Sequence, residues 1–439
     1  MKLNEFSATE LINKIDNHEV SLKEVVDACL EVVHEKDNEL KAWEYMDEAR
    51  VYENVDRLEE KQRRNILGKL KGIPVGIKDV FNTKDMPTTM GSEIWRGFTP
   101  GNDARVVHNI RENDGLVLGK TVTAEFAVHY LSADKTVNPH DPRRIPGTSS
   151  SGSAVSVASC MVPIALGTQT AGSIMRPSSY CGIYGFKPTF GVVPRTGTLK
   201  TTDTLDTIGC MARSTSDIML LFDILRVKGR DYPLIDKKLI SPDLSALSVI
   251  RIGYINDGLW VFDGFQKYTF EAFQEYLEKL SNIPNVELVN LTSIHKLNRI
   301  HTVHSQIYDK TLSYYFKNEF NEHHKMSDIM KTAIENGQKI SFEEYKKALD
   351  IQAKLRIEIE NKLKEIDILL TISTAGEAPL LNEEEPADTC LIWTFLGMPS
   401  LSLPKFKGPN GLPFGLLVTA KRYDDYKLLS ITKNVLETV

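Results

Sequence analysis

The chain has 439 residues, of which 41% are hydrophobic and 26% are charged, and its formal net charge is -6. This composition is typical of a folded globular protein with enough apolar side chains for a large core, and it excludes a globally disordered chain. Lys and Arg are scattered along the sequence and form no basic stripe, so we expect no nucleic-acid partner.

No apolar run approaches the length of a membrane-spanning helix, and the amino terminus lacks the uninterrupted apolar stretch of a signal peptide. We therefore expect a cytoplasmic protein that does not contact a membrane. The cysteines are odd in number and form no CxxC pair, which indicates buried, reduced thiols and no disulfide framework or metal site. They are Cys29, Cys160, Cys181, Cys210 and Cys390.

Residues 1–65 carry apolar side chains at helical spacing, which predicts a set of N-terminal helices. One of them begins at Ser21, because Glu24 lies three positions on and gives the spacing of a capping box. A second segment, residues 66–225, contains short apolar runs punctuated by Gly and Pro. Two of these runs, GIPVGIKDVF at 72–81 and GLVLGK at 115–120, predict buried strands.

Small residues crowd the stretch 137–200, as in PGTSSSGSAVSVASC and PIALGTQTAGSIMRP. A flexible linker also has this composition. Apolar residues between Ala154 and Leu166 are interleaved with the small ones, however, which favours a packed core with close backbone approach. We therefore expect residues 66–225 to form the catalytic core.

Residues 226–365 are charged, rich in aromatic side chains and helical in pattern, which predicts a variable layer that shapes the pocket. Residues 366–439 return to short apolar runs, DILLTIS, PSLSLP and GLLVTA, before a closing helix at 428–435. We predict one large α/β domain with a central mixed, mostly parallel twisted sheet covered by helices on both faces.

Three polar residues stand in unusual settings in the core segment: Lys78 in GIKD, Ser149 in GTSSSGSA and Ser173 in GTQTAGSIMRP. Their order and spacing resemble the amidase signature family of serine hydrolases, in which a bridging serine precedes the nucleophile by 24 positions, as Ser149 precedes Ser173 here. The likeness covers nearly the whole chain and is weakest at 226–365. It extends through MPTTMGS (86–92), GKTVTAEFA (119–127), TVNPHDP (136–142), CGIYGFKPTFG (181–191), LDTIG (205–209), GMPSLSLP (397–404) and GLPFG (411–415).

The resemblance implies the amidase signature fold and a Ser-Ser-Lys triad without a metal or cofactor. In this triad Ser173 attacks the carbonyl, and Ser149, whose peptide bond is cis, relays the proton to Lys78. A serine hydroxyl is a poor nucleophile until a base removes its proton. Burial after the apolar GIPVGI run would bring the pKa of Lys78 down into the range that a base needs.

The small residues before Ser173 let backbone N–H groups turn toward one point, as an oxyanion hole requires. We expect the N–H groups of Thr170, Ala171, Gly172 and Ser173 to form that hole. A phosphate-binding loop is the competing interpretation of GTQTAGS, but the lysine of that motif is absent.

Two residues are candidates for binding the substrate. Arg176 follows the nucleophile by three positions where the common family pattern has arginine at two, which resembles the malonamidase branch and implies recognition of a substrate carboxylate. Its alternative role is to pair with a local acid or carbonyl. Trp393 could line the pocket, and ordinary core packing is the alternative.

A Ser-His-Asp arrangement is not excluded by counting, since His108, His129 and His140 lie in the core segment, but none has a distinctive motif around it. His323 and His324 are adjacent and not spaced along one helix face, so we expect no metal site.

We predict hydrolysis of a carboxamide C–N bond in a small-molecule substrate, one that could bear a carboxylate, through an acyl-enzyme at Ser173 with release of ammonia or an amine. Two alternatives stay open: the glutaminase (A-type) subunit of a tRNA-dependent amidotransferase, and a non-catalytic binding or assembly protein on the same fold. We expect a homo-oligomer, in the form of a homodimer. A further alternative is that a small companion subunit covers the site.

Overall fold

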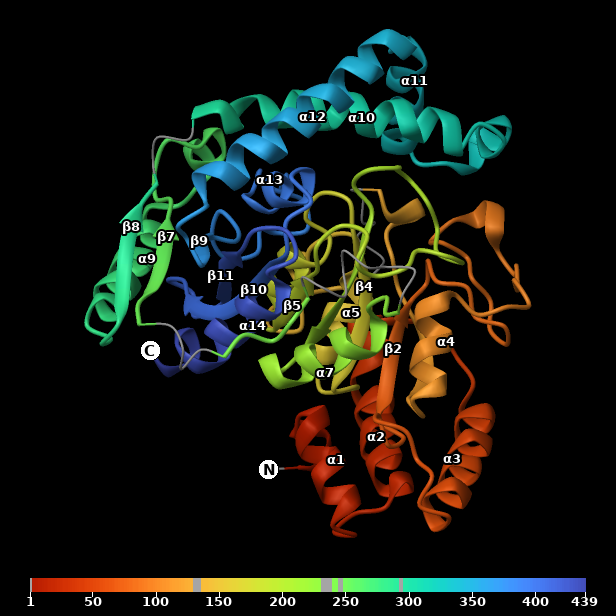
Figure 1. The fold of residues 1–439 in the computed structure, drawn as a ribbon. Helices are drawn as coiled ribbons and strands as arrows, with labels where there is room; N and C mark the ends of the chain where they lie inside the picture. The colour runs from red at the N-terminus through yellow and green to blue at the C-terminus, as the bar shows by residue number, and fades with distance from the viewer. Residues whose placement is uncertain (1, 129–135, 230–238, 244–247, 292–294) are drawn as a thin grey trace.

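The computed structural model describes residues 2–128, 136–229, 239–243, 248–291 and 295–439. Its centre is an 11-stranded sheet (Figure 1). The strands, in spatial order, are β1 (Trp43–Met46), β3 (Leu116–Thr121), β2 (Pro74–Lys78), β4 (Ile164–Gln169), β6 (Thr207–Ala212), β5 (Tyr184–Lys187), β10 (Ser400–Lys407), β11 (Pro413–Thr419), β9 (Ile368–Ile372), β7 (Ile250–Tyr254) and β8 (Val286–Asn290).

The sheet is mixed, as predicted, but the expectation that it is mostly parallel is wrong. Only the pairs β3–β2, β2–β4, β9–β7 and β7–β8 are parallel, and the six other pairs between the described strands are antiparallel. The antiparallel middle includes the hairpin of β10 and β11, whose five-residue connection (408–412) is too short for a parallel crossover. Apolar runs alone carry no signal for strand direction.

Two groups of helices cover this sheet. The first comprises α5 (Ser151–Ala158) and α6 (Met175–Cys181), which contact each other and the middle strands. The second comprises α4 (Arg105–Glu112), α7 (Thr215–Leu225) and α14 (Asp425–Asn434), in which α7 contacts both of the others. The predicted α/β domain with helices packed on a mixed sheet is therefore confirmed.

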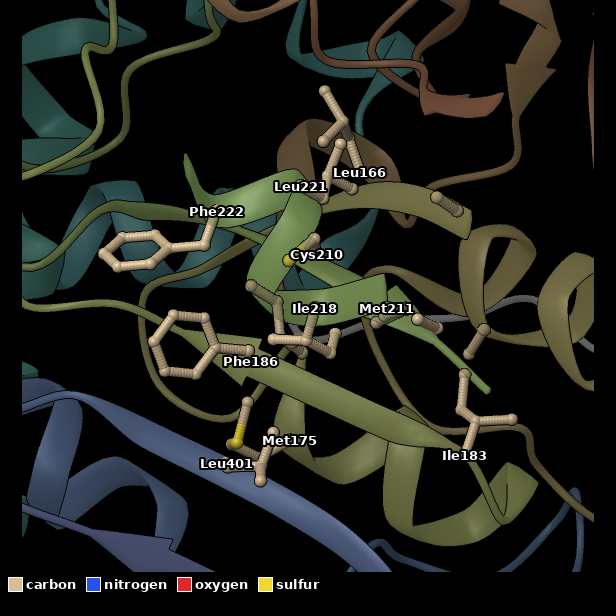
Figure 2. Packing of buried hydrophobic residues seen from close by; sticks show 14 of the residues in the cluster. Leu166, Met175, Ile183, Phe186, Cys210, Met211, Ile218, Leu221, Phe222 and Leu401 are labelled. Carbon is tan, nitrogen blue, oxygen red and sulfur yellow. The ribbon is translucent and has the colours of Figure 1, made fainter. Parts of the chain in front are cut away.

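The core of the sheet is apolar and closely packed. Figure 2 shows Phe186 of β5 facing Phe222 of α7, and Met175 of α6 beside Leu401 of β10. The rings of Phe186 and Phe222 meet edge to face with centroids 5.2 Å apart, and all four side chains are buried. Burial of each such side chain stabilises the fold by about 1.5–3 kcal/mol.

The N-terminal segment forms α1 (Ala8–Asp16), α2 (Leu22–Leu40) and α3 (Glu48–Arg63). The predicted start at Ser21 is confirmed, because the Ser21 hydroxyl accepts from the Glu24 N–H and the Glu24 carboxylate accepts from the Ser21 N–H. Between α2 and α3 the chain forms β1 and joins the sheet edge at β3. The helical spacing of this segment did not predict that strand.

The peripheral layer consists of α10 (Ile300–Tyr315), α11 (Asp328–Lys339) and α12 (Phe342–Lys362), which lie across the top of the molecule in Figure 1. The same part of the sequence also supplies β7, β8 and α9 (Lys267–Ser281), so it contributes one edge of the sheet as well as helices. Short helices elsewhere are α13 (Cys390–Phe395) and the 3-10 turns η1 (Leu3–Glu5), η2 (Glu93–Trp95), η3 (Glu125–Ala127), η5 (Trp260–Gly264), η6 (His295–Arg299), η7 (Glu319–Lys325) and η8 (Leu436–Thr438).

A separate apolar cluster joins the peripheral helices to the loop around Phe126. It comprises Phe126, Val128, Leu312, Phe316, Met326, Met330 and Ile334. The rings of Phe126 and Phe316 lie 4.7 Å apart. Among the helices that the structure describes, none has the length and apolar character needed to cross a membrane.

Candidate active site

The three polar motifs meet at the carboxyl ends of two middle strands. β2 and β4 are parallel neighbours, so their carboxyl ends lie on the same side of the sheet, which is where ligands bind in open α/β sheets. Lys78 is the last residue of β2. The loop after β4 carries Ser173 into α6, and Ser149 immediately precedes the turn into α5.

Lys78 is fully buried and surrounded by hydroxyl groups. Its Nζ lies 2.7 Å from Ser149 Oγ, 3.0 Å from Ser150 Oγ and 2.9 Å from Thr168 Oγ1. Burial lowers the pKa of Lys78 well below its ordinary value, and the charge of Asp206 opposes this shift. Neutral hydroxyl partners stabilise an ammonium group less than a carboxylate does, so the setting favours the neutral amine.

Ser149 is also fully buried, and the Thr148–Ser149 peptide bond is cis, as the family resemblance implied. The carbonyl of Ser149 accepts from the N–H of Ala124 at 3.3 Å. The next residue, Ser150, donates its N–H to the carbonyl of Ser173 at 3.3 Å. This bond joins the bridging-serine segment to the loop of the predicted nucleophile.

Gly147 explains why small residues are needed beside Ser149. It has φ +89°, and a Cβ at this position would lie 2.7 Å from Pro177 Cα. Only glycine fits a backbone position with such a φ and such a close neighbour. The segment before Ser149 therefore lies directly against α6.

Ser173 is partly exposed in the turn that leads into α6. The first N–H groups of this turn, those of Ile174 and Met175, donate to Gln169 Oε1 at 2.8 and 2.9 Å. The N–H groups of residues 171–173 have no hydrogen-bond acceptor within the described part of the chain. They are therefore available to bind an oxyanion.

Arg176 is buried and paired with two carboxylates of its own chain. Its Nε lies 2.5 Å from Asp388 Oδ2 and its Nη1 lies 2.8 Å from Glu385 Oε2. Burial lowers the pKa of Arg176, but the charges of Asp388 and Glu385 more than reverse this and hold it above its ordinary value. Glu385 also accepts from Thr148 Oγ1 at 2.8 Å. This geometry matches the local ion pair that was the alternative role for Arg176.

Trp393 lies in α13 and is fully buried within the main apolar core. Its neighbour Thr394 donates its hydroxyl to the carbonyl of Ala171 at 2.7 Å. Ala171 lies in residues 170–173, called the nucleophile loop below because it carries the predicted nucleophile.

Sequence reasoning missed Thr394, Gln169 and His304, whose ring nitrogen Nε2 lies 3.0 Å from the carbonyl oxygen of Thr170. Gln169 could have been identified, because it stands four positions before Ser173 inside the motif GTQTAGS. No local sequence pattern indicated a role for Thr394 or His304.

Among the residues that the structure describes, the histidines of the core segment form no Ser-His-Asp triad. His108 is exposed on α4, the ring of His140 contacts the carbonyl of Cys181 at 2.9 Å, and His129 lies outside the described residues. His323 and His324 are exposed in η7. Within the described ranges, no three His, Cys, Asp or Glu side chains are grouped so as to hold a metal ion.

A family model described as Amidase matches residues 24–429. The A-type subunit of glutamyl-tRNA(Gln) amidotransferase from Clostridium botulinum (strain Kyoto / Type A2) is 38% identical over 244 residues, which are 54% of this chain and 50% of that protein. The chain thus spans about half the length of the curated relatives it matches.

Solved structures resemble the whole chain. A crystal structure of an amidase superposes with a TM-score of 0.86 at 26% identity and covers 99% of both chains. The peptide amidase of Stenotrophomonas maltophilia gives 0.84 at 24% identity over 99% of this chain and 97% of that one. The A-type subunit of the Thermotoga maritima glutamyl-tRNA(Gln) amidotransferase gives 0.79 at 25% identity over 99% and 96%.

Proposed function

Because this chain belongs to the amidase family, we propose that it hydrolyses the C–N bond of a carboxamide in a small-molecule substrate. The reaction passes through an acyl-enzyme at Ser173 and releases ammonia or an amine. The observation that carries this proposal is the environment of Lys78, a fully buried lysine whose Nζ lies 2.7 Å from Ser149 Oγ. Such a lysine can act as a base at neutral pH.

The hydrogen bonds around Lys78 support a proton relay. A neutral amine has two N–H groups and one lone pair, and three hydroxyl oxygens lie within reach of it. The Ser150 hydroxyl hydrogen is directed to the Thr168 carbonyl at 3.2 Å, so Ser150 accepts from the lysine. Ser149 can then donate its hydrogen to the lysine lone pair and accept the hydrogen of Ser173.

In the first half-reaction the Ser173 oxygen attacks the amide carbonyl while its proton passes through Ser149 to Lys78. The N–H groups of residues 171–173 stabilise the negative oxygen of the tetrahedral intermediate. On collapse the C–N bond breaks, and the proton returns through Ser149 to the departing nitrogen. Water then attacks the ester by the same relay, releases the carboxylic acid and restores Ser173.

We assign Arg176 to holding the site together. Its guanidinium pairs with Asp388 and with Glu385, and Glu385 in turn accepts a hydrogen bond from the Thr148 hydroxyl. With two carboxylates beside the guanidinium, the cluster offers no net positive charge to an acidic substrate. This supports a neutral amide as substrate in preference to one that bears a carboxylate.

A panel of acidic, neutral and aryl amides tests the proposal, with ammonia or amine release as the readout. We expect turnover of at least one neutral amide by the purified wild-type chain and none by Ser173→Ala. Equal turnover by Ser173→Ala would overturn the assignment of the nucleophile. Fast turnover restricted to acidic amides would indicate that Arg176 binds the carboxylate of the substrate.

A second candidate function is the amidase subunit of a glutamine-dependent amidotransferase, supported by the 38% identity to the A-type subunit of such an enzyme over half of this chain. That role requires glutaminase activity that depends on a partner complex. Release of ammonia from glutamine only in the presence of co-purified subunits would favour it. A non-catalytic role is disfavoured by the contact of Lys78 with Ser149.

The homodimer stays a prediction, and so does a small companion subunit. Light scattering on the purified chain measures its mass directly, against 49.4 kDa for one copy. A mass of one copy with full activity would remove the dimer and the companion subunit from the proposal.

A further inference from the structure

Two carbonyl groups of the nucleophile loop are held by side chains from distant parts of the sequence. The ring nitrogen Nε2 of His304, on α10, lies 3.0 Å from the carbonyl oxygen of Thr170. Thr394 Oγ1, on α13, lies 2.7 Å from the carbonyl oxygen of Ala171. His304 therefore links the peripheral layer to the loop that carries the predicted oxyanion hole.

The tautomer of His304 follows from its partner. A carbonyl oxygen only accepts hydrogen bonds, so Nε2 must carry the hydrogen. The side chain is buried, with 5% exposure, and burial lowers the pKa of His304 to about 4, so the ring is neutral near pH 7. Its plane is set by stacking on Tyr308, with centroids 5.7 Å apart and 30° between the planes.

Thr394 is oriented in a similar way. Its oxygen accepts from Gln169 Nε2 at 2.8 Å. Its one hydrogen has two carbonyl oxygens in reach, that of Ala171 at 2.7 Å and that of Cys390 at 3.1 Å, and Ala171 is the nearer acceptor. Gln169 in turn accepts the N–H groups of Ile174 and Met175 through Oε1. The turn into α6 and the carbonyl of Ala171 therefore belong to one hydrogen-bond network.

The geometry of the peptide unit connects these contacts to catalysis. In a trans peptide the C=O of one residue and the N–H of the next point in opposite directions within one plane. Fixing the Thr170 carbonyl on His304 therefore fixes the direction of the Ala171 N–H, and fixing the Ala171 carbonyl on Thr394 does the same for the Gly172 N–H. These are two of the N–H groups that have no acceptor among the described residues.

We propose that His304 is a positioning residue for the oxyanion hole, holding the peptide unit between Thr170 and Ala171 so that its N–H faces the developing negative oxygen, with Thr394 holding the next unit. This rests on the proposed function of Ser173. The peripheral layer is then part of the catalytic apparatus, because it fixes donors that must be aligned before the reaction begins.

A matched pair of variants tests this role. Methionine and glutamine are similar in length to histidine, but only glutamine has an N–H to donate, so His304→Met removes the contact and His304→Gln keeps a donor. His301→Met, an exposed position on the same helix, is the control. The readouts are kcat and KM for the best neutral amide, and the inhibition constant of its trifluoromethyl ketone analogue, which forms a tetrahedral adduct with the nucleophile.

Loss of a whole oxyanion donor costs about 100- to 1,000-fold in rate, so a misdirected donor should cost about 10- to 100-fold. We expect His304→Met to lower kcat by that factor with KM unchanged, and to weaken the ketone by the same factor. His304→Gln should recover most of both losses, and His301→Met should behave as wild type. Unchanged kcat and ketone affinity in His304→Met, or a glutamine variant no better than the methionine variant, would overturn the proposal.

Thr394→Val and Thr394→Ser provide a second pair of variants. They test the alignment of the oxyanion-hole N–H groups if His304→Met does not fold. The serine variant should keep near-normal kcat and the valine variant should lose it, whereas equal values would contradict the proposal. Labelling of the wild-type chain by a fluorophosphonate separates this inference from the proposed function. Absence of both label and turnover in wild type would mean that the proposed function fails, whereas labelled, active wild type with unaffected variants means that only this inference fails.

Discussion

The segment at 66–225, which carries the proposed catalytic residues, and the peripheral region at 226–365 differ in how closely their side chains are packed. In the core, Lys78 and Ser149 are fully buried, and glycines such as Gly147 let neighbouring backbones approach closely. The peripheral region is built from amphipathic helices that leave large side chains in solvent, such as Tyr314 at 74% and Phe342 at 73% exposure.

This difference in packing indicates which region suits the reacting groups and which suits control of access to the site. Close backbone packing fixes several reacting groups within hydrogen-bond distance, which amide chemistry needs. Helices with one apolar face tolerate change on the other face and suit a layer that shapes access. His304 is one contact between the two regions, since it extends from α10 to the nucleophile loop.

The largest effect should come from removing the base of the core. We expect Lys78→Met to lower kcat/KM by about 10,000-fold or more, because the proton of Ser173 then has no acceptor. Steady-state kinetics measures this, with the thermal melting curve as a control for folding. A variant that kept more than about a tenth of the activity would remove Lys78 from the mechanism.

The next effect concerns stability. Arg176→Met removes the guanidinium that pairs with the buried carboxylates of Asp388 and Glu385, and loss of one member of a buried ion pair costs about 3–5 kcal/mol. Arg143, whose side chain is 81% exposed beside Asp141, is the matched control, and Arg143→Met should cost far less because solvent screens an exposed pair. Urea unfolding of both variants compares the two. Equal losses would mean that the cluster around Arg176 does not hold the site together.

A smaller effect is expected in the peripheral region. Met330 is fully buried in the apolar cluster that joins α11 to Phe126. Met330→Ala should cost about 2 kcal/mol of stability, at the low end for such a truncation because a small cluster can partly collapse. Its kcat should stay close to that of wild type, since Met330 belongs to the apolar cluster around Phe126 and not to the hydrogen bonds that His304 and Thr394 make to the nucleophile loop. A large fall in kcat would show that the layer as a whole, and not His304 alone, sets the rate.

The smallest effect is a shift in pH dependence. The neutral form of Lys78 is the active one, so kcat/KM should rise with pH through the lowered pKa of this lysine and level off below the ordinary lysine range. The charge of Asp206 raises that pKa, so Asp206→Asn should lower it further and move the rise to lower pH. A profile measured on both proteins tests the sign, and a rise displaced to higher pH would contradict it.

Much of the core could be predicted from sequence because its signals are local. The runs at 72–81 and 115–120 form β2 and β3, and the three later runs form β9, β10 and β11. The proposed triad of Lys78, Ser149 and Ser173 was predicted from motifs that resemble the amidase signature family. The structure places Lys78 against Ser149, and the cis bond at Ser149 is confirmed. The strand directions were not readable, because a short apolar run looks the same in either direction.

What sequence reasoning missed depends on contacts between distant residues. Arg176 lies more than 200 positions from Asp388 and Glu385, and His304 lies 134 positions from Thr170. No spacing rule connects such pairs, because only the folded sheet brings them together. The strands β1, β7 and β8 were not predicted, because each lies inside a segment whose dominant apolar pattern is helical.

The central claim is that Ser173 becomes acylated, and acid quenching during turnover tests it most directly. After proteolysis, mass spectrometry of the wild-type chain should find the acyl group of the substrate on the peptide that contains Ser173, and the Ser173→Ala variant should give no acyl peptide. Two results would contradict the account. One is an acyl group on a residue other than Ser173. The other is a Ser173 peptide that stays unmodified in wild type, as in Lys78→Met, although wild type still turns over and transfers the acyl group to hydroxylamine.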